Sequence, residues 1–374
     1  LLLICFLVYS FAQLGRYSYT SNTNSIISEY GITHTQASLP SSIFFLCYGV
    51  GQIINGIFCK KYNIKYVLPC SLFISCVCNI LLFAKVPFVF VKFIWGINGL
   101  AQSFLWVLLL QKVGKNISEK YMGTATLIMS FASTGGTFIS YGIFALFSGL
   151  NIYIYSFVCS AILMAIMGII WLLFSNLSKN DKNSIEKEND IKSANDLTSS
   201  EPKKGFVIML CLFTLLSTTS YMISGSLKSW SPNIFKELYG FEDWFSIFLS
   251  LFLPFCTIFN AYICRFLYKK IKDFNIICWI SFAACMIFSL IILFVIDKTW
   301  IMGVILIILI CVSSGIVTNA LTVQIPLFLQ NKKASSGFLA GILNGSCYLG
   351  NALGTFVLGI IVDNSSWNSV FLFF

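Results

Sequence analysis

Residues 176–204, NLSKNDKNSIEKENDIKSANDLTSSEPKK, form the one long polar stretch in this sequence. The rest of the chain is strongly apolar: 57% of the 374 residues are hydrophobic, 10% are charged, and the mean hydropathy is +0.86. In a soluble globular domain, roughly a quarter of the residues would be charged. The composition therefore predicts a polytopic membrane protein in which the polar stretch is a solvated, disordered linker.

Twelve candidate membrane spans can be marked, six before the polar stretch and six after it, since a spanning helix needs about 20 mostly apolar residues. Their approximate limits are 1–27, 38–59, 66–84, 87–111, 122–148, 152–175, 205–233, 245–267, 274–296, 299–326, 336–361 and 366–374, the last one truncated. The sequence thus predicts an all-α membrane protein with 12 transmembrane helices in two six-helix halves. These are an N-terminal bundle (1–175) and a C-terminal bundle (205–374), joined by a cytoplasmic linker (176–204).

The basic residues predict the orientation of the spans, because cytoplasmic loops carry an excess of Lys and Arg. With the N-terminus in the cytoplasm, 18 of the 24 basic residues fall in inner connections or in the linker. The others are Arg16, Lys85, Lys92, Lys228, Lys236 and Lys298. The net charge of +10 is thus a signal of topology. We expect the chain to associate with the lipid bilayer and not with nucleic acid.

The two halves repeat one another. A basic loop, GIFCKKYNIK (56–65), follows the second span, and another, CRFLYKKIK (264–272), follows the eighth. Such repetition is typical of transporters whose halves rock around a central site. Glycines at positions 49, 51 and 56 of the second span, and at 337, 341 and 345 of the eleventh, predict close helix packing.

Arg16, in the stretch QLGRYSYTSN (13–22), is the charged residue that lies deepest in a predicted span. It lies about 11 residues from the outer end, or ~17 Å at 1.5 Å per residue, near the bilayer midplane. An uncompensated arginine there costs at least ~2.5–3.5 kcal/mol. All 14 acidic residues fall in connections or at span edges. We expect Arg16 to line an aqueous cavity and bind an anionic substrate; the alternative is a structural arginine solvated by carbonyl groups and water.

Further candidates for substrate contacts lie at a similar depth. Tyr9 and Gln13 share a helix face with Arg16, and Tyr17 lies beside it. The remaining candidates are Gln52, Trp106, Tyr221, Lys228, Asn344 and Tyr348. Each also has a structural interpretation, because polar side chains within spans form interhelical hydrogen bonds. Lys228, one turn before a proline predicted to end its helix, can alternatively extend to the membrane surface.

No span contains an Asp, Glu or His to serve as a proton relay. Exchange or facilitated diffusion is therefore favoured over proton symport, while Na⁺ held by carbonyl groups stays open. The 14 cysteines lie mostly in apolar runs, and the single His34 cannot build a metal site by itself. We expect no metal, no cofactor, no catalytic residues and hence no enzymatic activity, in a monomeric chain.

Several motifs occur in a particular order along the chain. They are GRY (15–17), YGVGQIING (48–56), KKYNIK (60–65), NGLAQSFLW (98–106), STGGT (133–137), WSPNIFKE (230–237) and GFLAGILNGSCYLG (337–350). In order and spacing they resemble the major facilitator superfamily, and within it the organophosphate:phosphate antiporter family of glycerol-3-phosphate and hexose-phosphate transporters. The resemblance covers nearly the whole chain and implies a transporter that works by alternating access.

The resemblance also implies roles for particular residues. In that family an arginine at the position of Arg16 binds the substrate phosphate together with a second arginine in the seventh span. Ser224 stands at the position of that second arginine, and the nearest cation is Lys228, one turn away. Two guanidinium groups suit a phosphate with nearly two charges, whereas one suits a monoanion or a carboxylate.

We therefore expect a secondary active transporter of a small organic anion, a phosphate ester or a carboxylate, that works by exchange. Inorganic phosphate is a further candidate substrate. Two alternatives stay open. One is a membrane sensor of the same fold, because the family resembles in sequence a hexose-phosphate receptor. The other is a transporter of a neutral sugar or peptide in which Arg16 is structural.

Overall fold

The computed structural model describes residues 1–58, 61–117, 119–177, 204–296, 298–325 and 336–374. All regular structure within these ranges is helical. The first part of the chain forms α1 (Leu2–Ser21), α2 (Thr23–Tyr30), α3 (His34–Phe58), α4 (Ile64–Phe83), α5 (Phe88–Asn116), α6 (Glu119–Gly149) and α7 (Tyr155–Leu177). The second part forms α8 (Lys204–Tyr239), α9 (Asp243–Ser250), α10 (Phe252–Thr257), α11 (Asn260–Ile271), α12 (Phe274–Val295), α13 (Trp300–Asn319), the π-helix η5 (Ala320–Gln324), α15 (Ser336–Asn364) and α16 (Trp367–Phe373). Residues 178–203 of the predicted linker lie outside the described residues.

Nine helical segments in the described part of the chain are long and apolar enough to cross a membrane. Helices α9, α10 and α11 belong to one of them, an interrupted span from Asp243 to Ile271. Helices α1 and α6 and the seven-residue α16 are not among the nine. The predicted class, an all-helical membrane protein, is confirmed, and the number of twelve spans stays a prediction.

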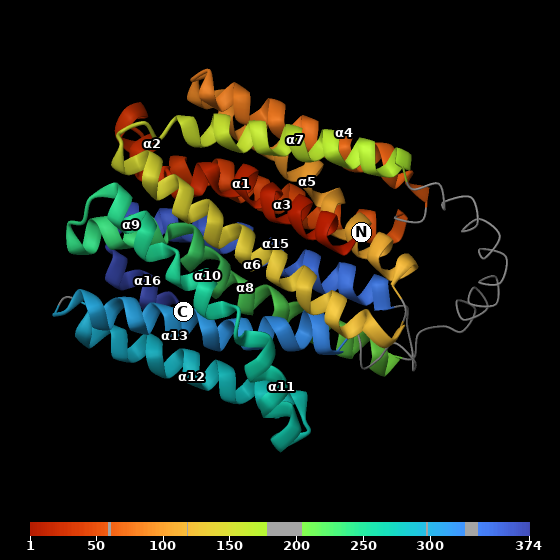
Figure 1. Ribbon diagram of the computed structural model, residues 1–374. Helices are drawn as coiled ribbons and strands as arrows, with labels where there is room; N and C mark the ends of the chain where they lie inside the picture. Colours follow the sequence, from red (N-terminus) through yellow and green to blue (C-terminus); the bar gives the residue numbers. More distant parts are fainter. Residues whose placement is uncertain (59–60, 118, 178–203, 297, 326–335) are drawn as a thin grey trace.

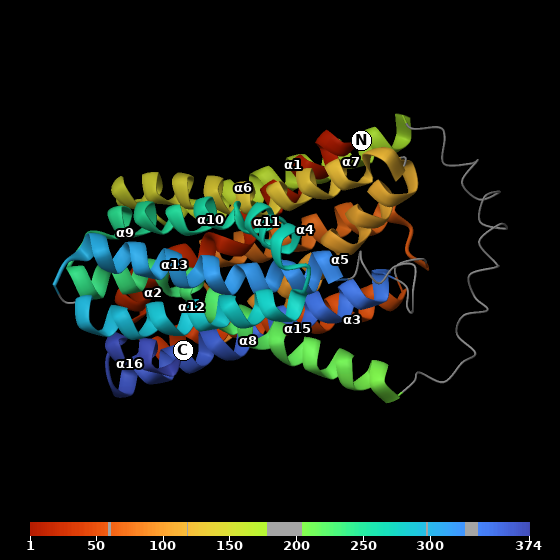
Figure 2. The same cartoon turned by 90° about the horizontal axis from the view of Figure 1, so that it is seen from below.

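The helices lie roughly side by side in an elongated bundle (Figures 1 and 2). The N-terminal bundle, α1 to α7, and the C-terminal bundle, α8 to α16, meet along α3 and α15 and where α6 packs on α9 and α10. We call the end that carries α2, α9 and α16 the α2 end. The opposite end, where α7 ends and α8 begins, is the linker end.

Glycines allow α3 and α15 to approach closely. A Cβ atom added to Gly49 would lie 2.9 Å from the carbonyl oxygen of Gly345. One added to Gly341 would lie 3.5 Å from the Cα atom of Gly56. This is the close packing that the spacing of the glycines predicts.

Pro232 does not end its helix, contrary to the sequence prediction, and α8 continues to Tyr239. A proline inside a helix leaves the carbonyl group four residues earlier without its N–H donor, and here that carbonyl belongs to Lys228. The Tyr141 hydroxyl donates to it at 2.8 Å and the Ser231 hydroxyl at 3.0 Å. The freed carbonyl group thus has two hydroxyl donors, one from α6 in the other bundle and one from α8 itself.

Polar contacts join the two bundles at the α2 end. The Asn24 side chain donates from Nδ2 to the carbonyl oxygen of Pro232 at 3.2 Å. The Ser25 hydroxyl donates to Oδ2 of Asp243 at 3.3 Å. Both contacts link α2 to the C-terminal bundle, so the bundles are closed on one another at this end.

Candidate functional site

A cavity of about 200 Å³ lies between the two bundles. The N-terminal bundle lines it with Tyr9, Trp106, Phe131, Ser133 and Thr134. The C-terminal bundle lines it with Tyr221, Ser224, Lys228, Thr257, Ile258, Asn260, Ala261, Tyr262, Gly315, Thr318, Asn319, Thr322, Asn344 and Tyr348. Apart from Ile258 these residues are aromatic, small or polar, and one carries a positive charge. None of the lining residues is acidic.

Seven of the eleven candidate residues from the sequence line this cavity. They are Tyr9, Trp106, Tyr221, Ser224, Lys228, Asn344 and Tyr348. The other four, Gln13, Arg16, Tyr17 and Gln52, lie outside the lining. The structure thus brings residues from both bundles to one place, and their role in substrate binding stays a prediction.

Lys228 supplies the positive charge of the cavity. It is one of the residues that line the cavity. Within the described part of the chain, no ion pair or hydrogen bond involves the Lys228 ammonium group, and the hydrogen bonds of this residue are those to its main-chain carbonyl. A buried ammonium ion without a partner is unstable unless water or a ligand compensates it.

Arg16 lies behind the cavity wall and is only 3% exposed. Its Nη1 donates to the Tyr348 hydroxyl at 3.1 Å, and its Nε donates to Oε1 of Gln102 at 3.4 Å. The guanidinium carbon lies 4.3 Å from the ring centre of Tyr48, 5.6 Å from that of Phe44 and 5.5 Å from that of Tyr348. All these partners are neutral, so no side chain among the described residues neutralises the charge of Arg16. Tyr348 connects this charge to the cavity, because it accepts from Arg16 and also lines the wall.

A cluster of aromatic rings surrounds this part of the wall. The ring of Tyr9 lies 4.8 Å from that of Trp106, and the ring of Tyr348 lies 4.4 Å from that of Tyr48 and 5.4 Å from that of Tyr221. Tyr48 was not among the sequence candidates. Its position one turn before Gln52, within a recognised motif, is the signal that would have identified it.

Amide side chains fix α1 beside its neighbours at the level of Arg16. Gln102 donates from Nε2 to the Ser75 hydroxyl at 2.9 Å. Asn98 donates from Nδ2 to the carbonyl oxygen of Gly15 at 3.0 Å. These bonds connect α1, α4 and α5, and they hold the Gln102 oxygen that accepts from Arg16.

The three other candidates outside the cavity make helix contacts. Gln52 donates to the carbonyl oxygen of Ser103 at 3.0 Å and accepts from Nδ2 of Asn344 at 3.2 Å, which ties α3 to α15. Tyr17 packs against Tyr141, with ring centres 5.6 Å apart. Gln13 is buried against Gly136 of α6, and its Nε2 has no hydrogen-bond partner among the described residues.

An interruption of the eighth predicted span contributes cavity residues that the sequence candidates omit. Helix α10 ends at Thr257 and α11 begins at Asn260, and both residues line the cavity. Asn260 approaches α13 closely because Gly315 has no side chain: a Cβ atom there would lie 2.0 Å from Nδ2 of Asn260. An asparagine within an apolar span, shortly after Pro254, is the sequence signal for this break.

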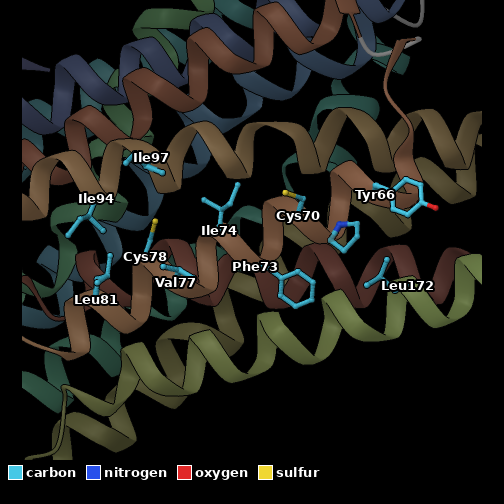
Figure 3. A pocket seen from close by; sticks show the side chains of 11 residues that line it. Tyr66, Cys70, Phe73, Ile74, Val77, Cys78, Leu81, Ile94, Ile97 and Leu172 are labelled. Carbon is cyan, nitrogen blue, oxygen red and sulfur yellow. The ribbon is translucent and has the colours of Figure 1, made fainter.

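A second, larger cavity of about 620 Å³ lies in the N-terminal bundle between α4, α5 and α7 (Figure 3). Its lining is almost entirely apolar, with Phe73, Ile74 and Val77 of α4 at its centre. Val77 is 55% exposed, as expected for a side chain that faces lipid. The Tyr66 hydroxyl is the one oxygen-bearing side-chain group among its lining residues, too few polar groups to orient a hydrophilic ligand.

Two helical bundles around a central polar cavity define the class of the protein, a membrane transporter. The family model described as Major Facilitator Superfamily matches residues 5–340. The chain therefore belongs to this superfamily, as its motifs predict, and is a multi-pass integral membrane transporter and not an enzyme.

The curated relatives include two with the name probable hexose phosphate transport protein, from Chlamydia trachomatis serovar D and Chlamydia muridarum. Each is 31% identical over 103 residues, which is 27% of this chain and 22% of the relative. Among solved structures, a bacterial homologue of the human lysosomal transporter Spinster, inward-facing and occupied, has a TM-score of 0.71 at 14% identity and covers 96% of this chain and 81% of its own. The xylose transporter XylE from E. coli, partially occluded and inward open, has a TM-score of 0.72 at 12% identity, with 99% and 94% covered. These structures support the fold alone.

Proposed function

We propose that this transporter exchanges small organic anions of the phosphate-ester class by alternating access, with Lys228 and Arg16 as the anion-binding groups. The observation that carries the proposal is an ammonium group in a central cavity whose lining contains no carboxylate. An anionic substrate is the natural partner of such a cation, since a charge-assisted hydrogen bond is roughly twice as strong as a neutral one.

Arg16 and Lys228 belong to different bundles, α1 and α8. An anion that contacts both cations joins the bundles, and binding energy is then coupled to their relative position. Arg16 donates to Tyr348 and Gln102, which are neutral. A phosphate is a better acceptor than either, so we expect it to draw the guanidinium toward the cavity past the Tyr348 ring.

The rest of the wall suits the uncharged part of a phosphorylated metabolite. Asn260, Thr318, Asn319, Thr322 and Asn344 offer amide and hydroxyl groups, which hydrogen-bond well to substrate hydroxyls. The names of the Chlamydia relatives agree with a hexose phosphate. Inorganic phosphate is the expected counter-substrate, and the distribution of Lys and Arg favours a cytoplasmic N-terminus and linker.

The test is exchange in proteoliposomes loaded with radiolabelled inorganic phosphate. We expect external hexose phosphate to release the label, a hexuronate to release it more slowly, and glucose to have no effect. In Lys228→Gln the rate should fall about 10- to 100-fold, because a charged hydrogen-bond partner contributes about 1.5–3 kcal/mol. Lys92→Gln, which removes an ammonium outside the cavity lining, is the matched control and should exchange normally.

Two results would contradict this proposal. Unchanged exchange in Lys228→Gln would remove Lys228 from the site. Transport of glucose in place of phosphate esters, insensitive to both Arg16→Ala and Lys228→Gln, would favour a neutral substrate. In that case the contacts of Arg16 with Gln102 and Tyr348 would be structural.

A further inference from the structure

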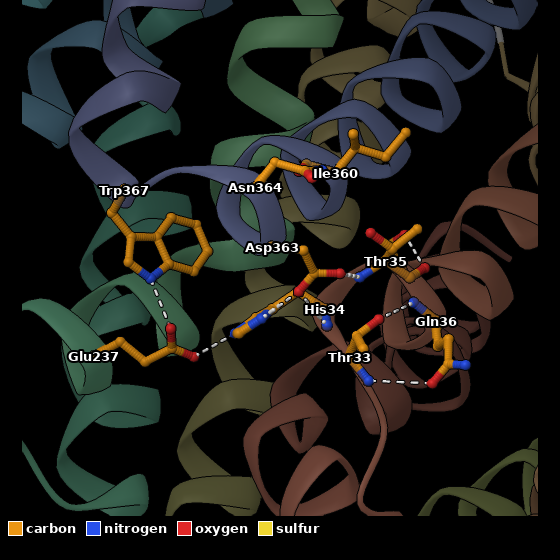
Figure 4. A network of polar contacts seen from close by, with 10 residues as sticks. Thr33, His34, Thr35, Gln36, Glu237, Ile360, Asp363, Asn364 and Trp367 are labelled. Carbon is orange, nitrogen blue, oxygen red and sulfur yellow. Dashed lines mark hydrogen bonds and ion pairs between the residues drawn. The ribbon is translucent and has the colours of Figure 1, made fainter.

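His34, Glu237 and Asp363 form a cluster of titratable groups (Figure 4). His34 follows α2 closely in the chain, so the cluster lies at the α2 end, and none of the three residues lines the central cavity. His34 is the first residue of α3, in the N-terminal bundle. Glu237 lies near the end of α8 and Asp363 near the end of α15, both in the C-terminal bundle. The cluster therefore bridges the two bodies that must separate when the cavity opens at this end.

The imidazole of His34 lies between the two carboxylates. Its Nε2 is 2.8 Å from Oε1 of Glu237, and its Nδ1 is 2.9 Å from Oδ1 of Asp363. An ionised carboxylate only accepts hydrogen bonds, so both ring nitrogens must donate, and an imidazole with two N–H groups is the protonated form. The geometry is therefore that of an imidazolium shared by two carboxylates.

Each carboxylate is held in place by further donors. Asp363 accepts from the backbone N–H of His34 at 2.9 Å and from that of Thr35 at 2.8 Å, so it caps the N-terminus of α3 from the opposite bundle. Glu237 accepts at Oε2 from the indole N–H of Trp367 at 2.8 Å. The acceptors are thus oriented independently of the imidazole.

The side chains that surround the imidazole contain no other charge that would replace the proton. On α8 the neighbouring Lys236 pairs with Asp243 at 2.8 Å. The other ring neighbours, Trp230 of α8 and Trp367 of α16, are neutral. In the first turn of α3, the residues after His34 are neutral too. Within the described residues, the cluster thus has a net charge of −1 with the proton and −2 without it.

Solvent reaches the cluster, because the side chains of His34, Glu237 and Asp363 are 21%, 31% and 20% exposed. A proton can therefore exchange with the aqueous phase at the α2 end. After its loss, one ring nitrogen presents a lone pair to a carboxylate oxygen at hydrogen-bond distance, which is repulsive. Asp363 would keep its two backbone donors, so the contact with Glu237 is the weaker one.

We infer that His34, Glu237 and Asp363 form a proton-binding site that closes the transporter at the α2 end. The bound proton links α3 to α8 and α15, and its release favours separation of the bundles there. A ligand that binds one conformation better shifts the equilibrium toward it, so low pH at the α2 end stabilises the closed form and high pH favours the open form. The proton returns to the same side, so it regulates access and does not drive transport.

The experiment measures the distance between the bundles without substrate, so its result is independent of the proposed anion site. Spin labels at cysteines introduced at Asn151 and Lys298, exposed positions in α2-end connections of opposite bundles, report the separation in lipid nanodiscs, in a chain whose native cysteines are replaced. We expect the long-distance population to increase at least threefold as the pH rises from about 5 to about 9, the range in which histidine titrates. In His34→Gln the population should not respond to pH.

Glu237→Gln provides a second variant in case His34→Gln does not fold, and its long-distance population should begin to increase at a lower pH. The control is Lys85→Gln, which breaks the Lys85–Glu29 ion pair at the same end but within one bundle. The Glu29 carboxylate raises the pKa of Lys85, so Lys85 stays charged over the pH range used and this ion pair adds nothing to the pH response. Removing it in Lys85→Gln should therefore leave the pH response like that of the parent. A parent chain without a pH response, or a full response in His34→Gln, would overturn the inference.

Discussion

The central cavity and the α2 end differ in whether their cationic side chains have charged partners. In the cavity wall, Lys228 has no charged or hydrogen-bonded partner among the described residues, and Arg16 behind the wall contacts neutral groups. At the α2 end, His34 lies between two carboxylates that are themselves held by other donors. An uncompensated cation is suited to an incoming anion, whereas an internally paired cluster is suited to holding helices together.

Reversing the charge of the cavity should have the largest effect on transport. Lys228→Glu places a carboxylate where an anion should bind, and like charges at close range cost several kcal/mol. We expect exchange of phosphate esters to fall by at least ~100-fold. Lys92→Glu makes the same substitution outside the cavity and should retain exchange. Activity of Lys228→Glu within threefold of the parent would show that the substrate does not meet this side chain.

A subtler change keeps the charge of Arg16 and alters its shape. A lysine cannot reproduce the planar donor arrangement that binds a phosphate in two places. For Arg16→Lys we expect a KM for the phosphate ester about 10-fold higher, which corresponds to ~1.4 kcal/mol. Arg265→Lys, at an exposed position on α11, is the control. An unchanged KM with a lower Tm would instead assign Arg16 a structural role.

The His34–Glu237–Asp363 cluster at the α2 end should make the thermal stability of the protein depend on pH. Because the proton on His34 supports the closed form, the Tm of the parent should fall as the pH rises through the titration of this residue. Asp363→Asn removes one of the two carboxylates and should reduce the pH-dependent part of the stability by about 1 kcal/mol. Asp273→Asn, at the N-terminus of α12, should leave the pH profile intact. Identical profiles for the two variants would contradict the assignment.

The smallest effect is expected at the carbonyl group freed by Pro232. Tyr141→Phe leaves the Lys228 carbonyl with the Ser231 hydroxyl as its remaining donor. We expect the free energy of unfolding to decrease by about 0.5–1 kcal/mol, measured as a lower Tm. Tyr155→Phe, at a ring that is 48% exposed, is the matched control. Equal melting of both variants would mean that the Tyr141 hydroxyl bond contributes nothing.

Much of the fold follows from the sequence, because in a membrane each span carries its own signal of length and apolar character. Composition, the division at residues 176–204 and the motifs lead to the helical class and the superfamily. The prediction that Pro232 ends its helix was wrong, because the helix boundary was inferred from local sequence alone. The Tyr141 hydroxyl, which donates to the carbonyl group that Pro232 frees, lies 87 residues before Lys228 in the chain.

The candidate site was predicted less completely for the same reason. The depth of Arg16 identified a residue in need of compensation, but its contact with Tyr348 joins positions 332 residues apart. Likewise, His34 was considered only as a metal ligand, since its partners lie 203 and 329 residues away. Long-range pairings of this kind are set by how the bundles dock and leave no periodic signal in the sequence.

The glycine contacts between α3 and α15 have a mechanical consequence. Where Gly49 faces Gly345, the backbones of the two helices touch, and the side chains of Ile53 and Leu349 pack over the glycines. A crossing that rests mainly on backbone atoms can pivot with little change in side-chain packing, whereas a crossing of many interdigitated side chains would force them out of their rotamer wells. We therefore expect this crossing to act as the fulcrum of the transport cycle, kept in contact while the two ends of the molecule open in turn.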